Sequence, residues 1–162
     1  MGSRRQARAR ALQFLFQCDL NPPEDLDEAL REFWETVETE EELAAGPPQA
    51  KPDGGSSSAP TVNQAAARLF AEQLIRGTLS ERDQIDGWIQ ELARNWTLPR
   101  MATVDRNVLR MAIYEMRHFP DIPPAVTINE AVELAKTYST EKSGKFVNGI
   151  LDNFRKRHLE DR

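Results

Sequence analysis

Two short segments of the chain combine basic and aromatic side chains, the residue types that hold phosphates and stack on bases. Stacking of one base on an aromatic side chain is worth ~1–3 kcal/mol in single-strand binding. The first segment lies in residues 4–16 and the second in residues 142–146. Together they supply the candidate nucleic-acid contacts Arg4, Arg5, Arg8, Phe16, Lys142, Lys145 and Phe146.

The first segment opens a predicted helix without an acidic residue in its first two turns. Arg4 and Arg8 stand four residues apart and share one helix face, with Arg5 beside them. Cations at a helix N-terminus oppose the helix dipole, and a bound phosphate would offset that repulsion. A solvated basic tail explains the arginines equally well, and Phe16, eight residues after Arg8, fits a core position at least as well as a base-stacking one.

The second segment lies where the last helix is predicted to start, at Ser143 or Gly144. Free backbone N–H groups and the positive end of the dipole make such a start an anion site, and Lys142 and Lys145 add positive charge. Phe146 follows directly, and the pattern leaves open whether it faces solvent or the core.

Catalytic and metal-binding patterns are weak. The sequence has no phosphate-binding glycine loop, and its two histidines, His118 and His158, lack metal-ligand spacing. Residues 139–142 match S-x-x-K without the companion motifs of that enzyme class. The single Cys18 lies on an apolar helix face, where an inert core thiol is expected, and it favours a reducing, cytoplasmic location. We therefore expect no catalysis, no metal and no cofactor.

Charge is distributed unevenly. The net charge is −5, but residues 19–53 hold twelve acidic and two basic residues, so the remainder carries a net charge of +5. Patches of opposite sign act independently beyond a screening length of about 10 Å. The acidic segment is expected to be a solvated helix face, with a basic protein partner as the alternative, and the basic remainder is compatible with nucleic acid.

Apolar residues recur at helical spacing throughout, which predicts an all-α bundle of six or seven helices in one domain. We expect an N-terminal lobe of residues 1–98 and a C-terminal lobe of residues 99–162. Residues 43–61 read as a disordered insertion, because Gly46–Pro60 has almost nothing to bury. The expected helices cover residues 4–20, 25–42, 62–93 (with a break or a close helix contact at Gly77), 103–118, 127–138 (opened by a capping box of Thr127 and Glu130) and 143–157.

Four segments in order, RRQARARALQFLFQ, VDRNVLRMAIYEM, INEAVELAK and KFVNGIL, resemble the NusB family of bacterial transcription antitermination factors. The resemblance covers nearly the whole chain except the insertion. It implies a two-lobed helical fold and binding of single-stranded boxA RNA in ribosomal RNA transcripts. It also implies a partner, the ribosomal protein NusE, and assembly with RNA polymerase. By position it assigns RNA binding to the seven candidates above and partner binding to Asp105, whose alternative role is to favour a helix N-terminus.

Some residues depart from the family pattern. Phe16 stands where tyrosine is common, so a hydroxyl contact is lost while stacking survives, and Lys142 stands where an acid can occur. Two other functions remain open. One is an accessory domain related to ribosomal RNA cytosine methyltransferases, which the end of the chain at Arg162 disfavours. The other is a helical regulator that prefers duplex DNA. The resemblance also leaves a homodimer open.

Overall fold

Seven α-helices and one short 3₁₀ helix make up the described part of the chain, which confirms the all-α prediction. The computed structural model describes residues 3–44 and 62–159. The predicted Gly46–Pro60 insertion lies outside these ranges, while residues 43 and 44 still belong to the second helix. In chain order the elements are α1 Ser3–Leu20, α2 Leu26–Ala44, α3 Val62–Ser80, α4 Arg82–Leu92, η1 Leu98–Arg100, α5 Thr103–His118, α6 Pro124–Tyr138 and α7 Glu141–His158.

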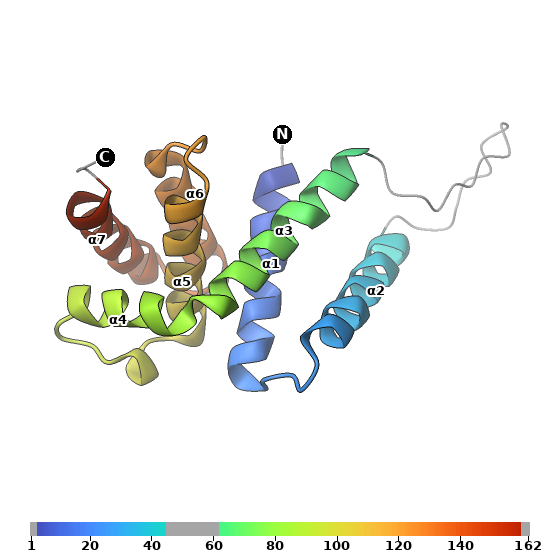
Figure 1. Ribbon diagram of the computed structural model, residues 1–162, viewed down its shortest axis with the longest axis horizontal. Coiled ribbons are helices and arrows are strands. Elements are labelled where there is room, and N and C mark those ends of the chain that lie inside the picture. Colours follow the sequence, from blue (N-terminus) through green and yellow to red (C-terminus); the bar gives the residue numbers. More distant parts are fainter. Residues whose placement is uncertain (1–2, 45–61, 160–162) are drawn as a thin grey trace, which may run out of the picture.

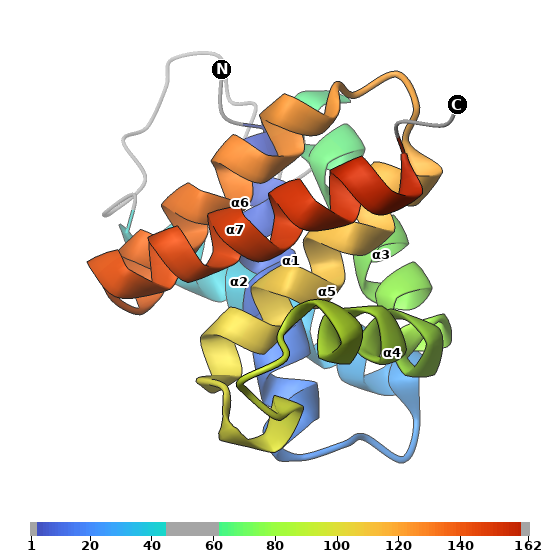
Figure 2. The same cartoon turned by 90° about the vertical axis from the view of Figure 1, so that its left-hand side faces the viewer.

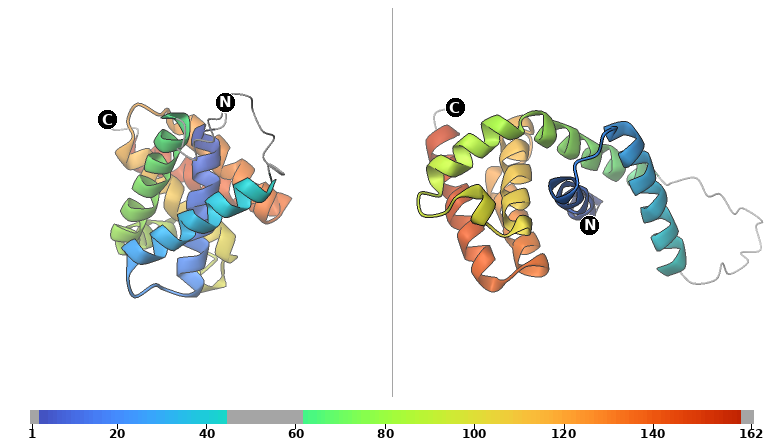
Figure 3. Two further views of the ribbon diagram at one scale, coloured as in Figure 1. Left: turned by 90° about the vertical axis from the view of Figure 1, so that its right-hand side faces the viewer. Right: turned by 90° about the horizontal axis from the view of Figure 1, so that it is seen from below.

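Helix α1 lies at the centre of the molecule (Figure 1). It packs against α3 and α5. On one side, α6 and α7 lie together as a pair that packs on α5 (Figure 2). Seen from below, α1 lies nearly end-on between α2 and the α5–α7 group, and α3 spans the two (Figure 3). One long side of α1 therefore faces away from α3.

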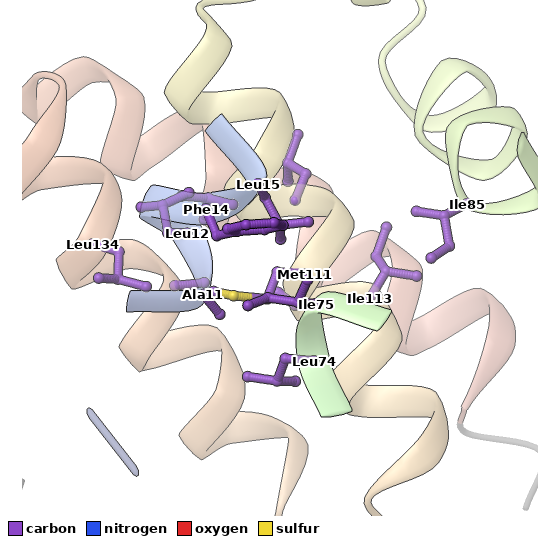
Figure 4. Packing of buried hydrophobic residues seen from close by; sticks show 14 of the residues in the cluster. Ala11, Leu12, Phe14, Leu15, Leu74, Ile75, Ile85, Met111, Ile113 and Leu134 are labelled. Carbon is purple, nitrogen blue, oxygen red and sulfur yellow. The ribbon is translucent and has the colours of Figure 1, made fainter. Parts of the chain in front are cut away.

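One continuous cluster of buried apolar side chains joins these helices. Figure 4 shows its centre, to which α1 contributes Ala11 and Leu15, α3 contributes Leu74 and α5 contributes Met111. Burying a side chain of this size is worth about 1.5–3 kcal/mol, so the cluster is the main source of stability. Because it runs through both predicted lobes, the division near residue 98 stays a prediction.

Helix α2 is attached by its aromatic stripe. Phe33 packs edge-on against Phe14 of α1 with 5.3 Å between ring centroids, and the indole N–H of Trp34 donates to Glu72 of α3 at 2.9 Å. The predicted N-cap is confirmed, since the Asp25 carboxylate accepts from the backbone N–H of Glu28.

A polar network fixes the end of α1 against α4 and α5. Asp19 accepts hydrogen bonds from Arg106 at 2.6 Å, from Asn107 at 2.9 Å and from Arg110 at 3.1 Å. Arg110 also forms a two-bond pair with Asp86 of α4. Burial alone would raise the pKa of Asp19, but the hydrogen bonds from Arg106 and Asn107 and the charges of Arg110 and Arg106 together hold that pKa below its ordinary value.

Several predicted helix features are wrong in detail. The long third helix breaks at Glu81, while Gly77 marks a close helix contact: an added Cβ atom would lie 1.9 Å from the Tyr114 ring. Thr127 does not cap α6, because the helix already starts at Pro124 and its proline ring sets the first turn. Among the described helices, none combines the length and apolar character needed to cross a membrane.

Candidate nucleic-acid interface

A groove of about 550 Å³ runs along the side of α1 that faces away from α3. Its floor is a stripe of α1 from Gln6 to Phe16, and its wall comes from Val104 at the start of α5 and Tyr138 at the end of α6. Phe16 is half-buried and Tyr138 is 55% exposed. Both aromatic side chains line the groove, so it offers stacking surfaces of the kind that hold single-stranded bases.

Arg4 and Arg5 of α1 have acidic partners elsewhere in the protein, so no bound phosphate is needed to offset their repulsion from the helix dipole. Arg5 forms two hydrogen bonds with Glu130 of α6, at 2.8 and 2.9 Å, while Arg4 lies 3.8 Å from Asp121. The hydrogen bond and charge of Glu130 raise the pKa of Arg5, and the same bond lowers the pKa of Glu130. Both arginines stay exposed, so they keep donors free toward solvent.

Arg8 lies inside the molecule. Its side chain forms a two-bond pair with Glu115 of α5, at 2.7 and 2.9 Å, and residue exposures are 4% for Arg8 and 1% for Glu115. The hydroxyl group of Thr127 also donates to Glu115. Arg8 thus links α1, α5 and α6. Because its guanidinium is buried in this pair, it has a structural role in the free protein and is not available for the predicted RNA contact.

The start of α7 differs from the predicted anion corner. The helix begins at Glu141, and the Thr140 hydroxyl accepts from the backbone N–H of Ser143 at 3.1 Å. The N–H of Gly144 bonds to the Thr140 carbonyl, and the side chain of Lys136 covers Gly144. Two of the N–H groups assigned to a ligand are therefore already used.

The carboxylate of Asp105 also contacts the start of α7. The Ser143 hydroxyl donates to Oδ2 of Asp105 at 2.9 Å, which ties the first turn of α5 to the first turn of α7. Asp105 is only 7% exposed, and its Oδ1 atom has no hydrogen-bond partner in the described part of the chain. Burial by itself disfavours an ionised carboxylate, but the hydrogen bond from Ser143 and the nearby positive end of α7 favour an acid at this position.

Lys142, Lys145 and Phe146 occupy the first turns of α7. Both lysines are exposed and have no ion pair within the described residues, and Phe146 is half-buried against the core. This half-buried position lies between the two alternatives that the pattern left open.

The structure brings the two basic-aromatic segments to one elongated face, not to one pocket. Val104 and Tyr138 line the groove at Phe16, and their chain neighbours Asp105 and Ser139 both bond to Ser143 of α7. The start of α7 therefore adjoins the groove wall. Arg5 lies eleven residues before Phe16, about 16 Å away along the helix at 1.5 Å per residue.

Two residues that line the groove were not among the candidates predicted from the sequence. Tyr138 ends the predicted helix of residues 127–138, and it lies at the exposed end of that helix, where a phenol can keep its hydroxyl in water. Arg10 follows the candidates Arg4, Arg5 and Arg8 along the first helix but was not one of them, and it is a lining residue. Its position between Gln6 and Gln13, on a polar stripe of α1, was the available signal.

The remaining reactive groups lie apart from this face. Burial raises the pKa of the Cys18 thiol to about 11, as expected for an inert core cysteine. Across residues 3–44 and 62–159, no three His, Cys, Asp or Glu side chains form a group that could hold a metal ion.

Known proteins match this chain over most of their length. It is 39% identical to the transcription antitermination protein NusB of Thermodesulfovibrio yellowstonii, over 96% of this chain and 93% of that protein. Identity to the Myxococcus xanthus protein of the same name is 41%, over 94% of each chain.

Solved structures agree with the fold. The T. maritima NusB structure superposes with a TM-score of 0.72 at 37% identity, over 98% of this chain and 94% of that one. A crystal structure of the antitermination factors NusB and NusE in complex with dsRNA gives a TM-score of 0.72 at 27% identity, over 98% and 99% of the two chains. Residues 5–156 match the NusB family, and the chain therefore belongs to the NusB family of transcription antitermination proteins.

Proposed function

We propose that this antitermination protein binds single-stranded boxA RNA of ribosomal RNA transcripts together with NusE and joins the antitermination complex on RNA polymerase. The observation that carries the proposal is the groove along α1, which presents the aromatic rings of Phe16 and Tyr138. Exposed cations lie near both of its ends: Arg4 and Arg5 at one, and Lys142 and Lys145 near the other. A related protein has been crystallised with NusE and dsRNA, which supports NusE and RNA as partner classes here.

The proposal assigns a task to each accessible candidate. Arg4, Arg5, Lys142 and Lys145 contact phosphates, because their charged groups are exposed. Phe16 and Phe146 supply apolar faces for bases, with half of each side chain already held by the protein. An extended single strand fits because the cations are spread along the face and not gathered at one point.

The salt dependence of boxA RNA binding tests the phosphate contacts. On single strands the slope of log affinity against log salt is about −0.7 per phosphate contact, so Arg4→Gln with Arg5→Gln should flatten the slope by about 1.4 if each arginine meets one phosphate. Arg31→Gln with Arg94→Gln is a matched control, because both residues are exposed and lie outside the groove. An unchanged slope in the Arg4/Arg5 variant would remove these arginines from the site. In a separate competition assay, a preference for duplex DNA over single-stranded RNA would favour a DNA-binding helical regulator instead.

We propose Asp105 as the residue through which NusE binding is controlled. Because its carboxylate is buried and holds Ser143, it acts by fixing the start of α7 and leaves Oδ1 as an unpaired acceptor. Asp105→Asn is expected to weaken NusE binding several-fold in calorimetry, because the ionised carboxylate that holds Ser143 is lost. Equal NusE affinity for the variant and the wild-type protein would exclude this role.

A further inference from the structure

Arg10 is the one charged side chain among the residues that line the groove, and acids of α2 hold it at the rim. Its Nη1 atom lies 3.6 Å from Glu40 and its Nη2 atom 3.6 Å from Glu41, at the end of α2. Nη1 also donates to Gln13, another lining residue, at 3.2 Å. The guanidinium thus lies between the groove and two carboxylates.

The contacts of Arg10 are looser than those of its neighbours on α1. Arg5 and Arg8 meet their acids at 2.8 and 2.7 Å, within hydrogen-bond range, whereas 3.6 Å is outside that range. Glu40 and Glu41 are also about half exposed. The side chain of Arg10 is only 23% exposed, so water screens these pairs mainly from the carboxylate side, and a better anion can displace the carboxylates.

Phosphate is the anion that fits this position. A guanidinium presents a planar set of donors that matches two phosphate oxygens, and the aromatic side chains of the same groove suit the bases of the strand. The carboxylates of α2 approach Arg10 from beside the groove, as α2 flanks α1 on the side opposite α6 (Figure 3).

We infer that Arg10 is a further phosphate-binding residue of this groove, and that Glu40 and Glu41 occupy its guanidinium until RNA displaces them. The inference rests on the proposed RNA binding and adds to it an internal competitor. The end of α2 then lowers RNA affinity for two reasons. The carboxylates of Glu40 and Glu41 must first move away from Arg10, and their negative charges then remain near the bound phosphate.

Titration of fluorescent single-stranded boxA RNA tests the inference in the full chain. Glu40→Gln with Glu41→Gln should tighten binding about two- to fivefold, the range expected for an exposed ion pair. Glu32→Gln with Glu35→Gln is the matched control: it changes net charge equally on the same helix, at exposed residues without an ion pair in the described ranges. Arg10→Gln should weaken binding and flatten the salt slope by about 0.7.

The decisive comparison is the variant that combines all three changes. If the acids act through Arg10, replacing them in the Arg10→Gln background should no longer tighten binding beyond the control. An equal gain with and without Arg10, or a gain no larger than that of the control, would overturn the inference while leaving the proposed function intact. If the wild-type protein does not bind the RNA, the proposed function fails and the inference fails with it.

Discussion

At the scale of single residues, three arginines of α1 with similar spacing have three different roles. Arg8 is buried in a pair with Glu115, Arg5 forms an exposed pair with Glu130, and Arg10 is held loosely at the groove. Sequence spacing placed Arg4 and Arg8 on one face, but it did not show that Glu115, more than a hundred residues away, lies opposite Arg8. Burial by a distant helix therefore separates a structural arginine from a binding one.

The buried pair predicts a clear difference in stability. Arg8→Met leaves the Glu115 carboxylate uncompensated inside the protein, and breaking such a pair costs about 3–5 kcal/mol. Arg8→Met combined with Glu115→Leu should lose much less, since no charge is left buried. Urea unfolding followed by circular dichroism measures both; an Arg8→Met protein as stable as wild type would show that the pair is not structural.

At the scale of helices, hydrophobic periodicity predicted the main elements because each of them buries one stripe. The stripe of α2 from Leu30 to Val37 is buried as expected. An apolar residue type alone does not decide burial, because contacts with distant helices matter: Leu69 is exposed on α3, whereas its neighbour Phe70 is buried. Helix starts were missed for a related reason, since Pro124 and Thr140 set the starts of α6 and α7 a few residues before the apolar stripes begin.

Two helical glycines should respond oppositely to alanine. At Gly77 the new Cβ atom would overlap the ring of Tyr114, so Gly77→Ala should destabilise the packing of α3 on α5. At Gly149 nothing lies within 4 Å, so Gly149→Ala should stabilise α7 by about 1 kcal/mol through helix propensity. Thermal unfolding of the two variants gives the comparison, and equal shifts in the same direction would contradict the helix contact at Gly77.

At the scale of the whole molecule, the candidate site depends on how three parts of the chain meet. The sequence identified both basic-aromatic segments and the resemblance to a protein family. It did not show that Val104 and Tyr138 line a groove along α1 that connects the two segments. No local pattern predicts such a groove, because its wall comes from the ends of two helices far away in sequence. The acidic segment was expected to be a solvated face, but two of its residues, Glu40 and Glu41, lie 3.6 Å from the guanidinium of Arg10.

Acid should loosen the molecule at the junction of α1, α4 and α5. The pKa of Asp19 is lower in the folded protein than in the unfolded chain, where it is near the ordinary value of 3.8. The ionised carboxylate therefore stabilises the fold at any pH above the unfolded pKa. This stabilisation is lost as the pH falls through the folded pKa. Asp19→Asn should therefore cost stability at neutral pH and progressively less below about pH 4, whereas Asp83→Asn, at an exposed site on α4, should follow wild type. Urea unfolding across this range measures the effect, and a constant difference between Asp19→Asn and wild type at every pH would contradict it.

The central claim is that one continuous face, from the arginines of α1 through the groove to the start of α7, binds RNA. Amide chemical-shift mapping of the labelled protein with single-stranded boxA RNA tests it most directly. We expect the amide chemical shifts to change along residues 4–16, at Val104 and Tyr138, and over residues 142–146, while those on the exposed side of α4 stay the same. Shifts centred on α4 or on the outer side of α3, with the groove along α1 unaffected, would contradict it.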